Sequence, residues 1–463
     1  MTDLTGLVPE FQCPDPHVEE IFRYRWKAYS THLLKRANGR YVVTEFSTPV
    51  DHSGVDGTIS CPAQHHILEG RWIRERTFMR DYISFWCSDE ALPRLYSFPL
   101  ADSCLKYCLV SDDFAMAADL YDAMADNYHQ WEKERFDADQ GLFWQIPDRD
   151  GMEFSLLALS YGKSHGGEGY RSTLNSYMYS DAVALAKMAE RFNRLREASV
   201  FREKAAALKE RFQLLMWNRK RSFFVDRRRD NRFFINGLEL EGYLPWCCGL
   251  ADERFSIAWK YIMDSDYFNG PFGLRTVERN HEDYLVEHGV PGGCMWNGWC
   301  WPFASAQALN AMANLLNDYR QTVVTRDDYF ELFRKYTLCH YKDGVPHLAE
   351  SYDPDEGCWY SDFGPRSVNY NHSSYCDLVI TGLAGLRMND DGSLSVNPLA
   401  PAEWDYFALR KVPFRGRELE IIYDRTGSRF GMGRGLFLVA DGKILCRSDN
   451  PLPDAAMVSV QLN

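Results

Sequence analysis

Carboxylic acids that stand among aromatic rings are the residues best suited to do chemistry in this sequence. Asp150 and Glu153 lie on either side of a glycine in the segment 148–155, soon after Phe143 and Trp144. A carboxyl group among rings is cut off from water, so its pKa rises and it can act as a general acid near neutral pH. A helix N-cap is an equally good interpretation of Asp150 and a poorer one of Glu153.

The acidic segment 347–357 supplies a second carboxyl, Glu350, from a distant part of the chain. Its other acids, Asp353, Asp355 and Glu356, lack the full spacing of a calcium loop, so we expect no metal here. General acid–base catalysis uses one group that donates a proton and a second group that accepts one. Glu350 is therefore the candidate partner of the first pair.

Two further segments offer polar groups that could hold a substrate. Arg80 and Asp81 lie among rings and could clamp neighbouring hydroxyls of a sugar, although a salt-bridged surface explains them equally well. Arg171 and Asn175 end the glycine-rich segment 162–175. That segment lacks the GxxxxGK[ST] pattern of a phosphate loop, so we expect an active-site loop that delivers these two side chains.

Aromatic residues are abundant, with 13 Trp, 26 Tyr and 28 Phe. Most rings fill cores, but Trp and Tyr also stack on the apolar faces of sugar rings. The segment 295–303 contains Trp296, Asn297 and Trp301 and reads MWNGWCWPF, with a proline suited to the first turn of a helix. We interpret it as a sugar platform, with buried packing as the competing interpretation.

The composition limits which partners and which cellular location we expect for this protein. The 463 residues carry a formal charge of −13, which argues against nucleic acids and anionic membranes as partners. The 13 cysteines are odd in number and scattered, as expected of buried free thiols. The N-terminus has no secretory pattern, and glycines and prolines interrupt the longest uncharged run, 289–317. We therefore expect a cytoplasmic protein.

Helical periodicity dominates the chain up to about residue 390, and short strands follow. Twelve helices in this part would each occupy roughly 31 residues, including a loop. This length is compatible with six helical hairpins and also with other large helical folds. The expected helices are 18–35, 112–136, 174–194, 198–216, 251–263, 301–318, 326–341 and 373–386. The expected strands are 407–414, 418–424, 435–440 and 443–447.

The order of these motifs resembles the six-hairpin glycoside hydrolases: trehalase, processing α-glucosidase I and, most nearly, the mannosylglycerate-hydrolase-like group. The segment GRW (70–72) with RDY (80–82) is similar to the GRF…WDSY segment of trehalase. DGMEFS (150–155) resembles SGWDFS, whose Asp is the general acid, and Glu153 stands at that position. The pair Leu174-Asn175 matches the DLN that follows.

Two later motifs continue the resemblance. WNG (296–298) with WP (301–302) resembles the W-x-G-x-x-W loop of the glucosidases. ESYDPDEG (350–357) resembles the E-x-Y-x-P-x-x-G loop, whose Glu is the general base, and Glu350 stands at that position. The sequence departs from the family at Glu153, which replaces an Asp, and before the last helix, where VNY (368–370) replaces FGW.

The resemblance implies an all-α fold: an (α/α)6 toroid over residues 1–390, closed by a small antiparallel β unit over residues 391–463. It implies an exo-acting hydrolase that inverts the anomeric centre, with Glu153 as general acid and Glu350 as general base. We expect no cofactor and a small carbohydrate as substrate, and a homo-oligomer stays open. The residues expected to hold the sugar are Trp72, Arg80, Asp81, Trp144, Asp150, Arg171, Asn175, Trp296, Asn297, Trp301 and Tyr352.

The sequence leaves three alternative functions open. A glycoside phosphorylase on the same barrel would need a basic pocket beside Glu350 for phosphate. A sugar epimerase would need paired catalytic histidines, whereas His165, His340, His347 and His372 are dispersed. A non-catalytic carbohydrate-binding protein is disfavoured because the loops carry carboxylates. The sequence leaves open which sugar, linkage and anomeric form is used.

Overall fold

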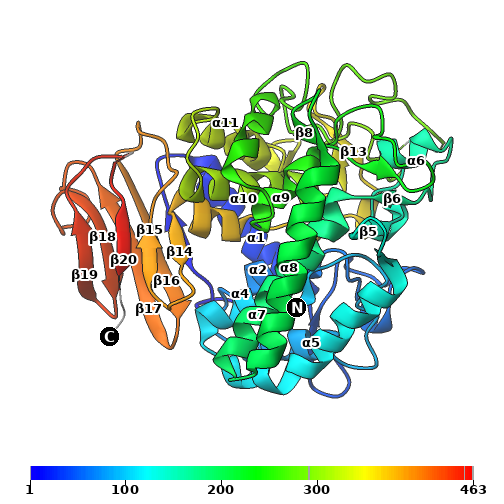
Figure 1. Ribbon diagram of the computed structural model, residues 1–463. Coiled ribbons are helices and arrows are strands. Elements are labelled where there is room, and N and C mark those ends of the chain that lie inside the picture. Colours follow the sequence, from blue (N-terminus) through cyan, green and yellow to red (C-terminus); the bar gives the residue numbers. More distant parts are fainter. Residues whose placement is uncertain (1, 290–291, 453, 461–463) are drawn as a thin grey trace.

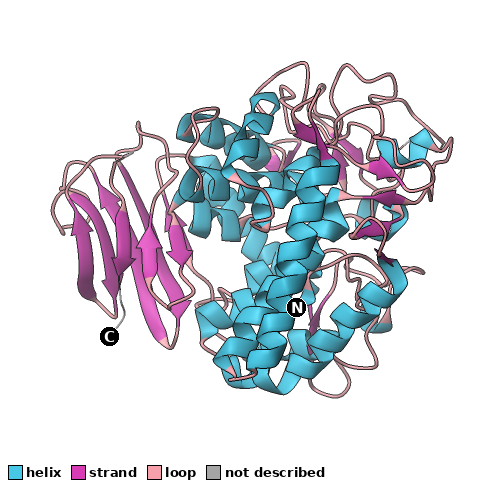
Figure 2. Cartoon of the chain, in the orientation of Figure 1, coloured by secondary structure: helices cyan, strands magenta, loops and turns pink. Residues whose placement is uncertain are grey.

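The apolar stripes of the sequence form helices that pack into one large body, with sheets at its side (Figures 1 and 2). The computed structural model describes residues 2–289, 292–452 and 454–460. The long α-helices are α1 (Pro16–His32), α4 (Leu100–Ser111), α5 (Phe114–Arg135), α7 (Ser172–Arg191), α8 (Leu195–Met216), α10 (Pro302–Asp318) and α11 (Arg326–Leu338). The shorter ones are α2 (Ala63–Gly70), α3 (Thr77–Trp86), α6 (Leu156–Ser160), α9 (Leu244–Cys247) and α12 (Cys376–Leu378).

Six of the expected helices are confirmed within a few residues at each end: α1, α5, α7, α8, α10 and α11. Their ends follow ordinary capping chemistry. Asp15 caps α1 by accepting from the backbone N–H groups of its first turn, and Thr325 forms a capping box with Asp328 at the start of α11. Pro302 occupies the first turn of α10, as the sequence predicted.

The expected helix 251–263 forms as a 3₁₀-helix, η4 (Glu253–Tyr261). Its buried side chains include Phe255, Ala258 and Tyr261, which recur every three residues. That spacing matches the three residues per turn of a 3₁₀-helix better than the 3.6 of an α-helix. Tertiary packing on neighbouring rings therefore selects the tighter form.

The expected helix 373–386 is also shorter than predicted. It begins at Cys376, and α12 continues directly into a π-helical turn, η6 (Val379–Leu383). The carboxylate of Glu69 accepts hydrogen bonds from the backbone N–H groups of Tyr375, Cys376 and Asp377. A carboxylate from another helix thus sets where this helix starts, which no local pattern reveals.

The C-terminal strands form two antiparallel sheets at one side of the helical body (Figure 1). The larger has the order β1-β16-β17-β18-β19 and the smaller the order β14-β15-β20. Their strands are β1 (Glu10–Gln12), β14 (Leu386–Met388), β15 (Leu394–Val396), β16 (Tyr406–Phe414), β17 (Arg417–Asp424), β18 (Gly435–Ala440), β19 (Lys443–Ser448) and β20 (Met457–Val460). The four strands expected from the sequence are confirmed.

Two strands that precede residue 391 belong to these sheets, although the predicted domain boundary between residues 390 and 391 placed them in the helical part. Strand β1 pairs with β16, and β14 pairs with β15. Phe11 of β1 contacts both Phe22 of α1 and Phe407 of β16, with ring centroids 5.9 and 6.2 Å apart. The N-terminus therefore ties the sheets to the helices, and one hydrophobic core runs through both.

Short β-strands and 3₁₀ turns lie in the loops of the helical body. The strands are β2 (Leu33–Lys35), β3 (Tyr41–Val43), β4 (Phe136–Asp137), β5 (Leu142–Gln145), β6 (Gly169–Tyr170), β7 (Trp217–Asn218), β8 (Phe223–Phe224), β9 (Arg227–Arg228), β10 (Tyr341–Lys342), β11 (Val345–Pro346), β12 (Ser351–Tyr352) and β13 (Trp359–Ser361). The 3₁₀ turns are η1 (Val55–Gly57), η2 (Pro147–Asp150), η3 (Leu240–Tyr243) and η5 (Gly364–Arg366). Among the described residues, none of the helices has the length and apolar character needed to cross a bilayer.

Candidate active site

One cavity of the helical body gathers residues from loops far apart in the sequence. Its volume is about 120 Å³, which is below the usual range for small-molecule sites, and it is open to solvent. The residues that line it are Glu45, Phe46, His52, Ile59, Cys61, Tyr96, Gly151, Glu153, Cys294, Trp296, Trp301, Phe303, Glu350, Arg366, Tyr370 and His372. Both carboxyls proposed from the sequence are among them.

Glu153 stands on the short connection between η2 and α6. Gly151 precedes it with φ of 71°, a left-handed conformation that favours glycine, and a Cβ there would come within 3.0 Å of the Cys61 sulfur. The backbone carbonyl of Glu153 accepts from the N–H of Trp296 at 3.0 Å. The Cys294 thiol donates to Oε2 of Glu153 at 2.9 Å. Both contacts fix this carboxyl against the loop that carries the tryptophans.

Glu350 immediately precedes the hairpin of β12 and β13 and is only 2% exposed. Its backbone N–H donates to the carbonyl of Ser361 at 3.0 Å. The hydroxyl of Ser367 donates to Oε1 of Glu350 at 2.9 Å, and a guanidinium nitrogen of Arg366 lies 3.8 Å from the same oxygen. These two neighbours favour the ionised form of the carboxyl.

Burial raises the pKa of both carboxyls above the ordinary value. For Glu153 the hydrogen bond from Cys294 opposes the effect of burial, and for Glu350 the charge of Arg366 and the bond from Ser367 oppose it. The negative charge of Glu153 further raises the pKa of Glu350. The two groups therefore share one low-dielectric space, where one of them can hold a proton while the other is ionised.

Aromatic side chains form the remaining wall of the cavity. Trp296 and Trp301 stack with their ring centroids 4.6 Å apart and their planes 7° apart, and Phe303 contacts Trp296 edge-on. Across the site, the rings of Phe46 and Tyr370 lie 4.7 Å apart. Of the predicted platform, Trp296 and Trp301 reach the cavity, and Asn297 does not line it.

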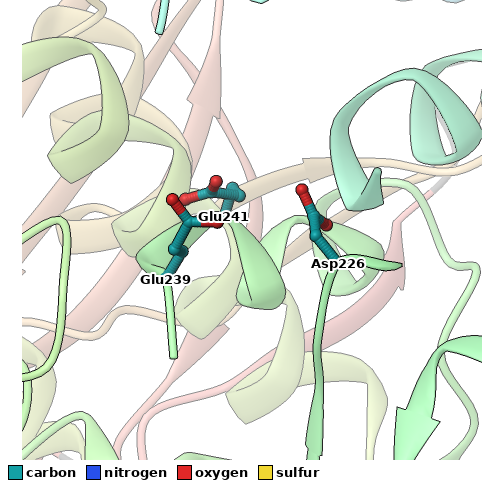
Figure 3. Close-up of side chains that lie close together, drawn as sticks. All are labelled: Asp226, Glu239 and Glu241. Carbon is teal, nitrogen blue, oxygen red and sulfur yellow. The ribbon is translucent and has the colours of Figure 1, made fainter. Parts of the chain in front are cut away.

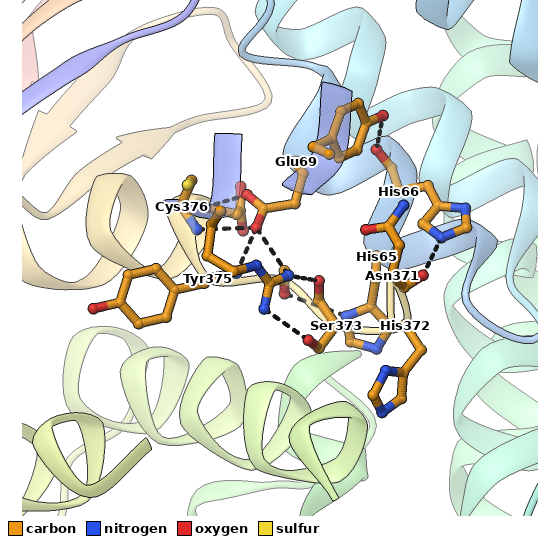
Figure 4. Close-up of polar contacts among 12 residues, drawn as sticks. His65, His66, Glu69, Asn371, His372, Ser373, Tyr375 and Cys376 are labelled. Carbon is orange, nitrogen blue, oxygen red and sulfur yellow. Dashed lines mark hydrogen bonds and ion pairs between the residues drawn. The ribbon is translucent and has the colours of Figure 1, made fainter. Parts of the chain in front are cut away.

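A polar network behind the cavity holds the segment that carries Tyr370 and His372 (Figure 4). The ring of His66 bonds the carbonyl of Asn371 at 2.5 Å, and Glu69 binds the start of α12. The guanidinium of Arg25, 3.7 Å from Glu69, also bonds the hydroxyl of Ser373 at 3.0 Å. The residues of this network that Figure 4 labels are His65, His66, Glu69, Asn371, His372, Ser373, Tyr375 and Cys376.

Nine of the residues predicted to hold the sugar do not line the cavity. Trp72 is fully buried, and its Nε1–H donates to the carboxylate of Asp377 at 2.7 Å. Arg80 is largely exposed and pairs with Asp113 at 3.0 Å, and Asp81 accepts from the backbone N–H of Tyr41. The alternative of a salt-bridged surface is the better interpretation of Arg80, whereas Asp81 holds the backbone of β3.

The others serve the framework in different ways. Trp144 lies in β5 between the guanidinium groups of Arg135 and Arg229. The amide of Asn175 bonds the backbone of Phe143, and that of Asn297 bonds the carbonyls of Asp283 and Val286. Tyr352 packs edge-on against Trp359. The remaining two, Asp150 and Arg171, form an ion pair at 3.2 Å.

That ion pair belongs to a second, buried group of acids, here called the Arg171 cluster: Arg171, Asp150, Asp226, Glu239 and Glu241. Arg171 is fully buried and lies 3.0 Å from Asp226 and 2.9 Å from Glu241. The acids Asp226, Glu239 and Glu241 offer oxygens within 4.8 Å of one another, a spacing that could hold a cation, and Figure 3 shows these three side chains. Here the guanidinium of Arg171 already supplies a positive charge.

Sequence reasoning missed several residues of the cavity. Cys61, Cys294 and Arg366 carried no motif, and Tyr370 stood out only as a departure from the family pattern. Glu45 had one usable signal, since it is the single charged residue in the apolar run YVVTEF at the end of β3. A carboxyl at the end of an apolar strand is costly unless it is used or paired.

Comparisons with known proteins relate the chain to the glycoside hydrolases. Residues 55–373 match the model of the mannosylglycerate hydrolase MGH1-like glycoside hydrolase domain, and residues 386–443 match that of the C-terminal domain of glycosyl hydrolase family 65. A solved structure described as a sialidase is 35% identical with a TM-score of 0.90 and covers 96% of this chain. The chain spans only 41% of that protein's length.

Two more distant structures share the fold. The GH63 mannosylglycerate hydrolase from Thermus thermophilus, in complex with glucose, is 12% identical, with a TM-score of 0.54 over 79% of this chain and 99% of its own. The GH78 family rhamnosidase of Bacillus sp. GL1 is 13% identical, with a TM-score of 0.62 over 94% of this chain and 41% of its own. The family model covers most of the chain and contains both cavity carboxyls. The chain therefore belongs to the mannosylglycerate-hydrolase-like family of glycoside hydrolases.

Proposed function

We propose that this glycoside hydrolase acts on the end of its substrate and inverts the anomeric centre, with Glu153 as general acid and Glu350 as general base. The observation that carries the proposal is that these two carboxyls, from loops far apart in the chain, line one cavity. We further propose that the helices form an (α/α)6 toroid over residues 1–390, with the cavity among its loops and the β unit of residues 391–463 beside it.

The environment of each carboxyl suits its proposed role. Burial raises the pKa of Glu153, so that it keeps a proton for the leaving oxygen. Ser367 and Arg366 stabilise the ionised form of Glu350, which can then remove a proton from a water molecule. An inverting reaction needs the two carboxyls about 6.5–9.5 Å apart, with that water between Glu350 and the sugar.

The shape and charge of the cavity bear on the substrate. A small pocket lined by Trp296, Trp301 and Tyr370 suits a terminal sugar better than the middle of a chain. Three carboxyls line it, and Arg366 is the single Lys or Arg among the described residues that do. We therefore propose a neutral sugar ring as the group transferred. A sialic acid would place its own carboxylate against these acids.

The same charges favour hydrolysis over phosphorolysis. A phosphorylase would bind a phosphate dianion where the water stands, next to Glu350, and the proposed basic pocket would consist of Arg366 alone. An epimerase gains no support, because His165 and His347 bond Asp148 and Asp362 and only His372 of the four candidate histidines lines the cavity. A binding protein would gain nothing from placing two carboxyls in a buried cavity.

Proton NMR of the first-formed product tests the proposal. The enzyme is incubated with glycosides of neutral sugars in both anomeric forms, and with mannosylglycerate, the compound after which a distant structural relative is named. Inversion at the anomeric carbon is expected, and added phosphate should yield no sugar phosphate. Retention, or a trapped glycosyl-enzyme, would make Glu350 a nucleophile and overturn its assignment as base.

A further inference from the structure

Glu45 is a third carboxyl of the cavity, which neither the sequence motifs nor the acid–base pair accounts for. It follows β3 and lines the cavity together with Glu153 and Glu350. It is only 6% exposed. The proposed reaction already has its general acid and its general base, so this third buried carboxyl needs a separate explanation.

One neighbouring segment, Tyr370 with Asn371, holds Glu45 in a fixed position. The hydroxyl of Tyr370 donates to Oε1 of Glu45 at 2.7 Å. The backbone N–H of Asn371 donates to the carbonyl of Glu45 at 2.9 Å, and the Asn371 amide bonds the carbonyl of Thr44 at 3.2 Å. Because the carbonyl of Asn371 is itself bound by His66, the segment that holds Glu45 is tied to the framework. Such a group is preorganised to meet a ligand.

No cation within the described residues forms an ion pair with Glu45. Arg366 lies closer to Glu350, to which it forms the only ion pair of this cavity among those residues. Oε2 of Glu45 makes no hydrogen bond to a described residue. The other titratable groups that line the cavity or act on Glu45 are Glu153, Glu350, His52, His372, Cys61, Cys294, Tyr82, Tyr96 and Tyr370.

Three carboxyls with one arginine cannot all be ionised in one buried space, because like charges repel strongly there. Burial raises the pKa of Glu45 to about 8, and the charges of Glu350 and Glu153 raise it while the bond from Tyr370 lowers it. The histidines do not restore the balance, since burial lowers the pKa of both His52 and His372. At neutral pH, Glu45 therefore carries a proton, with Oε1 occupied by Tyr370 and Oε2 left for the hydrogen.

We propose that Glu45 is a neutral carboxylic acid that donates a hydrogen bond from Oε2 to one oxygen of the bound sugar and so helps to select the sugar. This inference rests on the proposed function, in which the cavity binds a neutral sugar ring. A carboxylate would accept hydrogen bonds only, whereas the neutral acid offers a donor. Its neutrality also spares Glu350 a negative neighbour and so favours the ionised form of the base.

Glutamine is the matched substitution, because its amide is neutral, accepts from Tyr370 and donates to the sugar. Glu45→Gln should lose less kcat/KM at pH 7 than Glu45→Ala, because the amide can still donate to the sugar. In the wild type, KM should rise above pH 8 as Glu45 ionises and loses its donor, and this rise should vanish in Glu45→Gln. Asp51→Asn, an exposed acid on the same loop, serves as the control and should keep the rise.

Glu45→Ala removes the donor and should raise KM about 10- to 100-fold, as expected for one buried hydrogen bond. A series of monodeoxy substrates then identifies the contact. One deoxy position should be equally poor for the wild type and for Glu45→Ala, because the partner is missing in both cases. Circular dichroism checks the fold, and Glu45→Gln carries the test if the alanine variant does not fold.

Loss of activity in Glu45→Gln, to the level of Glu153→Gln, would show that Glu45 acts as an ionised or catalytic group and would overturn the proposal. Wild-type KM in both Glu45 variants would overturn it as well, since no contact would then exist. A readout without turnover separates this inference from the proposed function. Titration of the free product sugar, followed by the fluorescence of Trp296 and Trp301, should show the same loss of affinity in Glu45→Ala even if Glu153 and Glu350 prove not to be the catalytic pair.

Discussion

The cavity and the Arg171 cluster are two groups of buried acids in one chain, and they differ in how their charge is balanced. In the Arg171 cluster, four carboxyls surround a guanidinium that contacts three of them at 3.2 Å or less. In the cavity, three carboxyls share one arginine, which is 3.8 Å from its nearest carboxyl oxygen. The first arrangement pairs its acids with a buried cation, and the second leaves its acids able to meet a ligand.

The comparison separates acids that support the fold from acids that act on substrate. Glu153 and Asp150 are three residues apart, yet Glu153 faces the cavity and Asp150 faces Arg171. The Arg171 cluster also lies directly behind the acid: the backbone N–H of Leu156 donates to Glu239 at 2.7 Å, and Arg171 lies 3.4 Å from the sulfur of Met152. Charge pairing on one side of this loop thus positions the proton donor on the other.

The largest expected effect falls on activity alone. Glu153→Gln and Glu350→Gln should each lower kcat by about 10²–10⁴-fold, because the acid or base is lost, and leave the melting temperature within a few degrees. Glu356→Gln, an exposed acid on the same loop as Glu350, is the control and should be active. A glycosyl fluoride, whose leaving group needs no proton, should restore turnover to Glu153→Gln and not to Glu350→Gln. The opposite pattern would exchange the two roles.

The next effect falls on stability. Arg171→Met removes the only guanidinium of the Arg171 cluster and leaves its acids unpaired, so urea unfolding should show a loss of about 3–5 kcal/mol. Arg80→Met breaks the exposed pair with Asp113 and should cost no more than about 1 kcal/mol. Equal losses in the two variants would mean that burial does not distinguish these ion pairs.

A smaller effect concerns the thiol that contacts the acid. Cys294 donates to Glu153 and lowers its pKa against the effect of burial. Cys294→Ala should therefore move the basic limb of the kcat/KM profile to higher pH and lower kcat by about 10-fold or less, whereas Cys294→Ser keeps a donor and should keep the limb in place. An unchanged profile in Cys294→Ala would show that the thiol does not position the acid.

The smallest effect is a change in how stability depends on pH. Burial raises the pKa of Glu241 from its ordinary 4.5 to about 7. The folded chain thus binds a proton that the unfolded chain releases, and this contribution is complete below pH 4.5 and disappears as pH rises through 7. Glu241→Gln lacks this titration, so its stability relative to the wild type should increase over that window. Urea unfolding at several pH values measures the difference, and a constant difference would contradict the assignment.

Much of this molecule follows from the sequence by itself. Apolar spacing placed α5, α7 and α8 to within a few residues, because burial of one helical face is a local pattern. Alternation and turn residues placed β16 to β19 in the same way. The order of short motifs singled out Glu153 and Glu350, since ring and carboxyl neighbours along the chain already limit what a loop can do.

Tertiary structure alone decided which polar groups face the cavity. The sequence could not show that Arg80 pairs with Asp113 on the surface or that Trp72 binds Asp377, because both contacts join distant segments. It could not reveal Glu45, whose neighbours Glu350 and Tyr370 are brought to it by folding. The direction of a side chain and the charge around it depend on long-range packing, and these decide whether an acid supports the fold or acts on a sugar.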